Sequence, residues 1–177
     1  MQPLTCPIPN NINPLQSNGF LFTVTKLPEI SFFCQEANIP SIDLPPAEQY
    51  SPLVDAPQPG DKLQFGDLSL TFLIDENMVN YSALYDWIVG LGFPKNNQQF
   101  TDWVKTHKSF PKDADGPATV SDGVLQVLNS SNNVAKTILF RDMFPTSISS
   151  LQLQSTTSDT SYLAGSVTFR YTLYEIV

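Results

Sequence analysis

Apolar and polar residues alternate over several short stretches of this chain, a pattern typical of strands that bury one face. The first stretch is Phe20–Lys26, and Ile30–Ala37 follows after a short turn as its predicted hairpin partner. Two short strand pieces are predicted around the Gly66–Asp67 turn signal. The second of these pieces is "LSLTFLI", and further strands are predicted in "GVLQVLN", "AKTILFRDMFP", "SISSLQLQS" and "LAGSVTFRYTLYEIV". Since strands outnumber helices, the chain is expected to be mainly β, and a barrel or sandwich would bury the apolar faces.

One helix interrupts this pattern, because the spacing of apolar residues changes after Asp75 to that of a helix. We predict a helix over about residues 76–91, with Asp75 as its cap. Gly90, Gly92 and Pro94 are residues that end a helix. The helix is expected to cover an open face or end of the sheet with an apolar stripe made of Tyr81, Leu84, Tyr85, Ile88 and Leu91.

Residues 38–61 form a segment of a different kind, with six prolines among isolated apolar residues. Proline cannot donate a ladder hydrogen bond, so the segment fits an extended arm or edge hairpin rather than a central strand. A loop of this length is uncommon in a compact domain and is usually functional or disordered. Its apolar content argues against disorder, although an ordinary surface loop remains the alternative. We predict that four of its residues lie at an interface between subunits or rings: Leu44, Tyr50, Leu53 and Val54.

The length of 177 residues suits one domain. Residues 1–18 are rich in proline and asparagine and are predicted to be an irregular N-terminal arm. Residues 19–177 are predicted to form one β domain, which carries the extended arm 38–61 and a polar insertion at 95–119. One further helical turn is expected within that insertion.

The chain is acidic, with a formal net charge of −8 and no cluster of basic residues. Tight binding to DNA or RNA is therefore not expected, because phosphate recognition needs clustered lysine and arginine. A surface past which DNA slides fits this charge, and so does an ordinary acidic soluble protein. No apolar run approaches the ~20 residues of a membrane span, and no signal peptide is evident, so assembly in a cytoplasm is expected. Cys34 is expected to be a buried inert thiol. The sequence does not decide whether it forms a disulfide with Cys6.

Few residues indicate catalysis or metal binding. His107, the single histidine, lies in a polar stretch between lysines with no nucleophile motif nearby. Asp113–Gly116 matches only part of a calcium loop. Asp75 and Glu76 are adjacent at the start of the predicted helix, where acidic residues are favoured electrostatically. We therefore expect no enzyme activity, no metal site and no cofactor.

Three stretches carry a family resemblance. They are "FFCQEANIPSIDLP", then "LSLTFLIDENMVNYSALYDWI", and finally "ILFRDMFPTSISSLQLQS" with "YLAGSVTFRYTLYEIV". In this order they resemble the tail-tube protein family of contractile-tailed bacteriophages, and the resemblance covers roughly Gly19 to Val177. It implies a tail-tube-like β-barrel or sandwich with one flanking helix. Six copies would join their sheets into a ring, and stacked rings would form a hollow tube.

The resemblance also implies partners and a location. The partners would be five further copies in a homo-hexamer and the adjacent tube, sheath, terminator or baseplate rings. The location would be the virion tail, with no membrane. DNA would pass through the lumen without specific binding. The long insertion 95–119 leaves a terminator, baseplate hub ring or tube initiator open as alternatives to the repeating tube. From other classes, a carbohydrate- or receptor-binding β-sandwich would use Trp87, Trp103 and the tyrosines as stacking platforms, and an enzyme of unknown class is the third possibility.

Overall fold

The computed structural model describes residues 14–28, 31, 33–92, 94–106, 119–154 and 162–177. The chain is mainly β, as predicted, with strands that outnumber helices in the described residues. The strands are β1 (Phe20–Val24), β2 (Cys34–Ala37), β3 (Ile42–Asp43), β4 (Ala47–Gln49), β5 (Ala56–Gln58), β6 (Gln64–Phe65), β7 (Leu68–Leu73), β8 (Ser121–Leu128), β9 (Val134–Ile148), β10 (Ala164–Arg170) and β11 (Leu173–Ile176). The helices are α2 (Val79–Gly92) and α3 (Asn97–Thr106).

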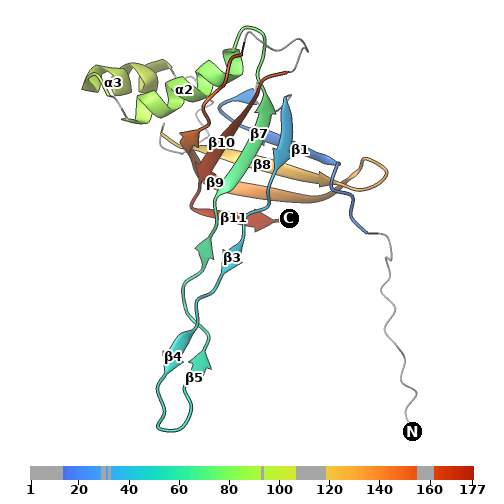
Figure 1. Cartoon of the computed structure of the whole chain (residues 1–177), viewed down its shortest axis with the longest axis vertical. Coiled ribbons are helices and arrows are strands. Elements are labelled where there is room, and N and C mark those ends of the chain that lie inside the picture. The colour runs from blue at the N-terminus through green and yellow to red at the C-terminus, as the bar shows by residue number, and fades with distance from the viewer. Residues whose placement is uncertain (1–13, 29–30, 32, 93, 107–118, 155–161) are drawn as a thin grey trace.

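The body of the molecule consists of two antiparallel layers that share strand β9. The hydrogen-bonded order is β1-β8-β9-β10-β7-β2, and β11 also pairs with β9. β1, β8 and β11 belong to one layer, whereas β10, β7 and β2 belong to the other. The strands of the two layers cross steeply in Figure 1.

A bulge at Asp142 bends β9 from one layer into the other. Asp142 has a φ of 53°, in the left-handed region that aspartate tolerates better than most residues. Its backbone N–H donates to the carboxylate of Asp122 at 3.2 Å, and the β8–β9 register shifts there. Such bulges re-aim a strand. The residues before Asp142 pair with β8 and β11, Met143 still pairs with Ser121 of β8, and residues 144–148 pair with β10.

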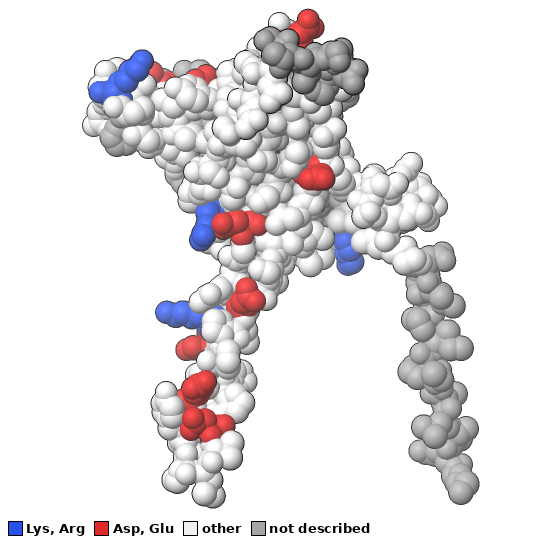
Figure 2. Space-filling model, viewed as in Figure 1, with Lys and Arg blue, Asp and Glu red and all other residues white. Residues whose placement is uncertain are grey.

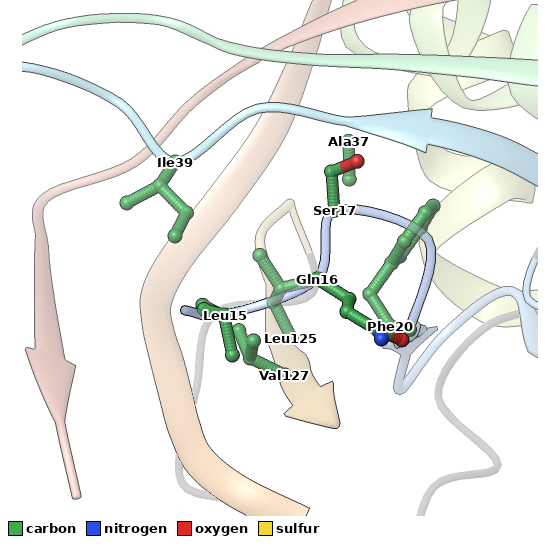
Figure 3. Close-up of a pocket in the computed structure, with 9 residues that line it drawn as sticks. Leu15, Gln16, Ser17, Phe20, Ala37, Ile39, Leu125 and Val127 are labelled. Atoms are coloured by element: carbon green, nitrogen blue, oxygen red, sulfur yellow. The ribbon is translucent and has the colours of Figure 1, made fainter. Parts of the chain in front are cut away.

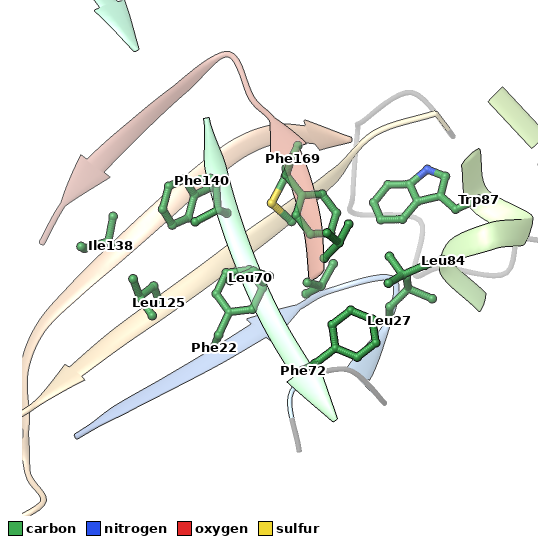
Figure 4. Close-up of a cluster of buried hydrophobic side chains, with 14 of the residues drawn as sticks. Phe22, Leu27, Leu70, Phe72, Leu84, Trp87, Leu125, Ile138, Phe140 and Phe169 are labelled. Carbon is green, nitrogen blue, oxygen red and sulfur yellow. The ribbon is translucent and has the colours of Figure 1, made fainter. Parts of the chain in front are cut away.

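The core lies between the layers, where the alternating apolar residues of both sheets meet (Figure 4). These side chains have almost no exposed area, so they account for most of the burial that stabilises the body. The central residues are Phe22, Leu125, Ile138 and Phe140 from one layer, and Leu70, Phe72, Val167 and Phe169 from the other.

The predicted hairpin of Phe20–Lys26 with Ile30–Ala37 is wrong. β1 pairs with β8 and β2 pairs with β7, so these consecutive strands lie at opposite ends of the strand order. Within the described residues β1 and β2 are not hydrogen-bonded to each other, and the sheet does not close into a barrel. The fold is therefore an open sandwich.

The C-terminal strands also differ in extent from the prediction. β9 continues through Pro145 to Ile148, and the described residues that follow it, up to 154, form no strand. The last predicted strand divides at Tyr171 into β10 and β11, which pair with successive parts of β9. The bend in β9 makes this division necessary, because a straight strand could not follow both parts.

The predicted helix is confirmed as α2, although it begins at Val79 rather than at residue 76. Asp75 is therefore not its cap. A turn precedes the helix, in which the Met78 N–H donates to the Asp75 carbonyl at 2.8 Å and Met78 has a φ of 54°. The Asn80 side chain joins the helix to the sheet by donating to the Leu73 carbonyl at 2.8 Å.

The buried face of α2 is rotated from the predicted stripe, and it consists of Asn80, Leu84, Trp87 and Gly90. Tyr85 is exposed. The helix lies at one end of the sandwich (Figure 1), where Trp87 contacts Phe169 with ring centroids 6.1 Å apart. This position agrees with the expectation that the helix covers an end of the sheet.

A second helix, α3, occupies the insertion for which only one further turn was predicted. Trp103 of α3 stacks on Trp87 at 6.4 Å with an interplanar angle of 10°. The Lys26 ammonium lies 5.7 Å and 5.3 Å from the two ring centroids, within cation–π range. Because Trp87 and Trp103 are only 1% and 7% exposed, neither can serve as a glycan-stacking platform.

Gly90 permits the close approach of the two helices, and its substitution tests that contact. A Cβ at Gly90 would lie 2.5 Å from Cγ of Trp103. We expect Gly90→Ala to lower the free energy of unfolding by about 1–2 kcal/mol, since overpacking outweighs the gain in helix propensity. Chemical denaturation measures the loss, and a red-shifted tryptophan emission would show that the Trp87–Trp103 stack has become exposed to water.

Gly92 offers the matched control, because a Cβ there would meet nothing within 4 Å. Gly92→Ala should leave stability unchanged or raise it by up to about 1 kcal/mol. Equal effects of the two substitutions would contradict the role assigned to Gly90.

Candidate subunit interface

The segment 38–66 is a hairpin arm that continues two strands of the body. The pairing of β2 with β7 passes into that of β3 with β6 and then of β4 with β5. Figure 1 shows the arm extending well away from the sandwich. Every residue of β3, β4 and β5 is exposed, so this ribbon has no core of its own.

The proline-rich composition fits a two-stranded ribbon, in which each strand is an edge and a missing N–H can face solvent. Two glycines let the strands approach. A Cβ at Gly60 would collide with the Pro45 carbonyl oxygen, and one at Gly66 would lie 2.8 Å from Oγ of Ser41. At the tip, the Ser51 N–H donates to the Asp55 carboxylate at 3.3 Å.

The structure places all four predicted interface residues on the arm surface. Leu44, Tyr50, Leu53 and Val54 are 46%, 82%, 93% and 76% exposed. Tyr50, Leu53 and Val54 come together in the tip between β4 and β5, whereas Leu44 lies nearer the body, next to β3. The sequence reasoning omitted three other exposed apolar residues of the arm, which the same signal of isolated apolar side chains would have found: Ile39, Ile42 and Leu63.

The arm is also acidic, with four carboxylates and one lysine between residues 42 and 65: Asp43, Glu48, Asp55, Asp61 and Lys62. Figure 2 shows these acidic side chains along the ribbon. The arm therefore presents exposed apolar residues at a tip that also carries Asp55, on a negatively charged stem.

A small apolar pocket marks the seam between β1 and β2 (Figure 3). Its volume is about 130 Å³, and none of its lining residues is ionisable. The outer edges of β1 and β2 beside it have no strand partner within the described parts of the chain. Unpaired edges are a ready template for strands of another chain. The lining residues include Leu15, Phe20, Ala37, Ile39, Leu125 and Val127.

The described residues offer little for catalysis or metal binding. Among them no group of three or more histidine, cysteine or acidic side chains is placed to hold a metal ion. Asp75 and Glu76 lie in the turn before α2. His107 and Asp113–Gly116 lie outside the described residues. Neither described helix has the length and apolar character of a membrane span.

Cys34 is a free, half-buried thiol, and Cys6 lies outside the described residues. Burial raises the pKa of Cys34 to about 11, although its contact with the Glu36 carbonyl acts in the opposite direction. A raised pKa keeps the thiol protonated at neutral pH. The residue is half-buried rather than buried as expected, and its inertness stays a prediction.

Alkylation kinetics test this assignment. At pH 8 we expect Cys34 to react with iodoacetamide about a hundredfold more slowly than an unperturbed cysteine, because its thiolate fraction is smaller by that factor. The rate should keep rising until the pH approaches 11. Peptide-resolved mass spectrometry separates Cys34 from Cys6, and a urea-unfolded sample serves as the control. A rate equal in the folded and unfolded chains would contradict the raised pKa.

Comparison with solved structures gives the same fold at low sequence identity. The chain is similar to a chain of the anti-feeding prophage cap (the AFP tube terminating cap), with a TM-score of 0.64 and 15% identity, covering 98% of this chain and 97% of that one. A chain of the PVC sheath–tube complex, an extracellular contractile injection system in the extended state, matches with a TM-score of 0.58 and 15% identity, covering 94% and 93%. A chain of the PVC sheath/tube terminator matches with a TM-score of 0.53 and 15% identity, covering 99% of both chains.

No curated protein sequence matches the chain. The sequence profile of the family described as "Phage tail tube protein" matches residues 5–177, which is nearly the whole chain. That family consists of structural tube proteins rather than enzymes. The resemblance inferred from the sequence is confirmed, and the chain belongs to the phage tail tube protein family.

Proposed function

We propose that this protein is a structural subunit of a phage tail tube, in which six copies form a ring and the rings stack. The observation that carries the proposal is the hairpin arm, a ribbon that exposes Tyr50, Leu53 and Val54 at its tip. Clustered exposed apolar residues mark interaction sites, and this tip lies far from the sandwich formed by the described residues of its own chain (Figure 1). The arm would bury these residues against a neighbouring subunit or ring.

The open edges of β1 and β2 support lateral joining of subunits, because pairing across two chains would satisfy both edges. The net charge of −8 supports a channel that repels phosphate, so DNA would pass during ejection without specific binding. The subunit would assemble in the host cytoplasm and remain in the virion tail, next to tube, sheath, terminator or baseplate rings.

The alternative within the same fold is a terminator, cap or baseplate ring. The observation that favours it is α3, a second helix stacked on α2 through Trp87 and Trp103. In an end ring, this added helix would give the subunit a surface that differs from that of its neighbours.

Negative-stain electron microscopy of the purified protein, with mass photometry across a range of concentrations, tests the proposal. Sixfold rings that grow into tubes of varied length would support the repeating tube. Rings that stop at one or two layers would favour the end ring. A protein that stays monomeric at all concentrations, and does not join tail particles when co-expressed with their other components, would contradict both.

A further inference from the structure

Two tyrosines of the body hold the arm at its root, which consists of residues 38–40 and 65–67. Tyr171 and Tyr174 lie at the junction of β10 and β11, where the last predicted strand divides. The Tyr171 hydroxyl donates to the Gly66 carbonyl at 2.9 Å, on the returning strand of the arm. The Tyr174 hydroxyl donates to the Pro40 carbonyl at 3.1 Å, on the outgoing strand. The two strands of the arm are therefore each tied to the same short stretch of the body.

The aromatic rings connect these hydrogen bonds to the core. Phe65 of the arm lies 6.1 Å from Tyr171 and 5.5 Å from Tyr174, measured between ring centroids. The same tyrosines lie 5.1 Å and 5.7 Å from Phe140, which is fully buried. Tilted and edge-on ring contacts at these distances are favourable and restrict rotation. A continuous packed path thus runs from the core to the first residues of the arm.

Polar contacts beside the cluster further restrain the root. The Asn38 side chain accepts a hydrogen bond from the Ser69 N–H at 2.6 Å and donates to the Asp67 carbonyl at 3.1 Å. Asp67 also forms an ion pair with Arg170 at 2.6 Å. Both charged side chains are substantially exposed, so the ion pair adds little to stability.

Beyond the root, the arm has only itself for support. Among the described residues, the hydrogen bonds of segment 46–58 stay within the ribbon, as in the pairing of β4 with β5. An isolated two-stranded ribbon is marginally stable, so its direction depends on how its base is held. From Ile42 to Tyr50 the ribbon spans about 25 Å at ~3.3 Å per residue, so a rotation of about 10° at the root displaces the tip by about 4 Å.

We propose that Tyr171 and Tyr174 are positioning residues that set the direction of the arm through their hydroxyl groups. The two phenol groups hold opposite strands at one level, which fixes both the tilt and the twist of the ribbon. Burial, followed by the neighbouring Tyr174 and Asp67, raises the pKa of Tyr171 to about 12, so its hydroxyl remains a donor at physiological pH. The consequence for assembly rests on the proposed function, whereas the positioning itself is a property of the single subunit.

The test is the double variant Tyr171→Phe/Tyr174→Phe, which keeps all four rings and removes both hydroxyls. Nitroxide labels are placed at Leu53→Cys in the tip and Lys136→Cys on the body, with Cys6 and Cys34 replaced by serine. Both label sites are exposed. Pulsed electron paramagnetic resonance on dilute monomer measures the distance between them. We expect loss of two hydrogen bonds to raise the population of undocked arms about tenfold to hundredfold, which broadens the distance distribution.

Tyr81→Phe is the matched control, because it removes a hydroxyl that bonds the Ser149 carbonyl at 3.4 Å, outside the root cluster. It should leave the distribution unchanged. The single variant Tyr174→Phe, which should broaden the distribution less, replaces the double variant if the latter does not fold. A distribution as narrow as that of the parent would overturn the positioning role. A broadened distribution with normal rings and tubes would uphold that role and would instead contradict the proposed function of the arm.

Discussion

Removing the distal arm is expected to abolish assembly while the body stays folded. Asp43 and Gln64 are register partners, so an Asn-Gly turn between them can replace residues 44–63 with a two-residue hairpin loop. The root stays intact, and the removed residues contribute little to the core, since those of β4 and β5 are all exposed. Thermal unfolding followed by circular dichroism should be nearly unchanged, whereas rings or tubes should be absent from electron micrographs.

Point substitutions at the tip separate the apolar contact from the length of the arm. Burial of an apolar side chain of this size contributes roughly 1.5–3 kcal/mol, so Leu53→Ser/Val54→Ser should weaken each contact by about a hundredfold or more. Ser51→Ala is the matched control at the same tip. For the variant that lacks residues 44–63, normal assembly would mean that the arm is an ordinary surface loop. Unfolding of that variant would mean that the arm belongs to the core of the monomer.

Loss of the Trp87 side chain is expected to be the most destabilising single change outside the sheets. Trp87 contacts Trp103 and Phe169, and its indole N–H donates to the Thr119 carbonyl at 3.2 Å. Trp87→Ala should lower the free energy of unfolding by about 3–5 kcal/mol, as for other fully buried aromatic residues. Because domains are stable by only about 5–15 kcal/mol, this loss is a large fraction of the total.

Urea denaturation measures this effect, and Trp87→Phe is its control. Phenylalanine retains a ring against Phe169 and loses only the hydrogen bond and part of the stack, so its effect should be clearly smaller. A loss below about 1 kcal/mol for Trp87→Ala would mean that the helices do not depend on this contact, which is far below the usual cost of a buried aromatic residue.

Local patterns identified most strands of this protein but not their neighbours. The alternation that predicted Phe20–Lys26 is a property of a few consecutive residues, and it recurs in the burial of Phe22 and Val24. The partner of this strand lies about a hundred residues further on, where Phe20 pairs with Val127. A turn signal after a strand does not reveal whether the chain returns to the same sheet, so the expected hairpin was wrong.

The helical part shows the same division between local and tertiary information. Apolar spacing located α2, but its buried face depends on what packs against it. Trp87 faces inward because Phe169 and Trp103 are there to receive it. The helix Asn97–Thr106 was missed because most of its residues are polar, although Trp103 packs it against α2.

For the candidate interface, composition predicted the extended segment, but residue position along the chain did not reveal what holds the segment in place. Prolines and isolated apolar residues predicted an extended segment, and the structure shows the predicted residues exposed on a ribbon. Whether they bury against another subunit stays a prediction. The tyrosines at the root could not be predicted, because alternation puts Tyr171 and Tyr174 on opposite faces of one strand. The break between β10 and β11 instead turns both toward the arm.

The continuity of the arm with β2 and β7 has a consequence for how such a subunit could change over evolution or by design. Side chains alternate across a strand, so one added residue in a single strand would turn every later residue to the opposite face. Two residues added to each strand would instead lengthen the ribbon by about 7 Å and preserve its faces. The reach of the arm can therefore be adjusted in discrete steps near β4 and β5 without altering one residue of the sandwich. A tube built from such subunits would acquire a new spacing between rings, or a new partner, through a change in arm length alone, while the sandwich keeps its fold.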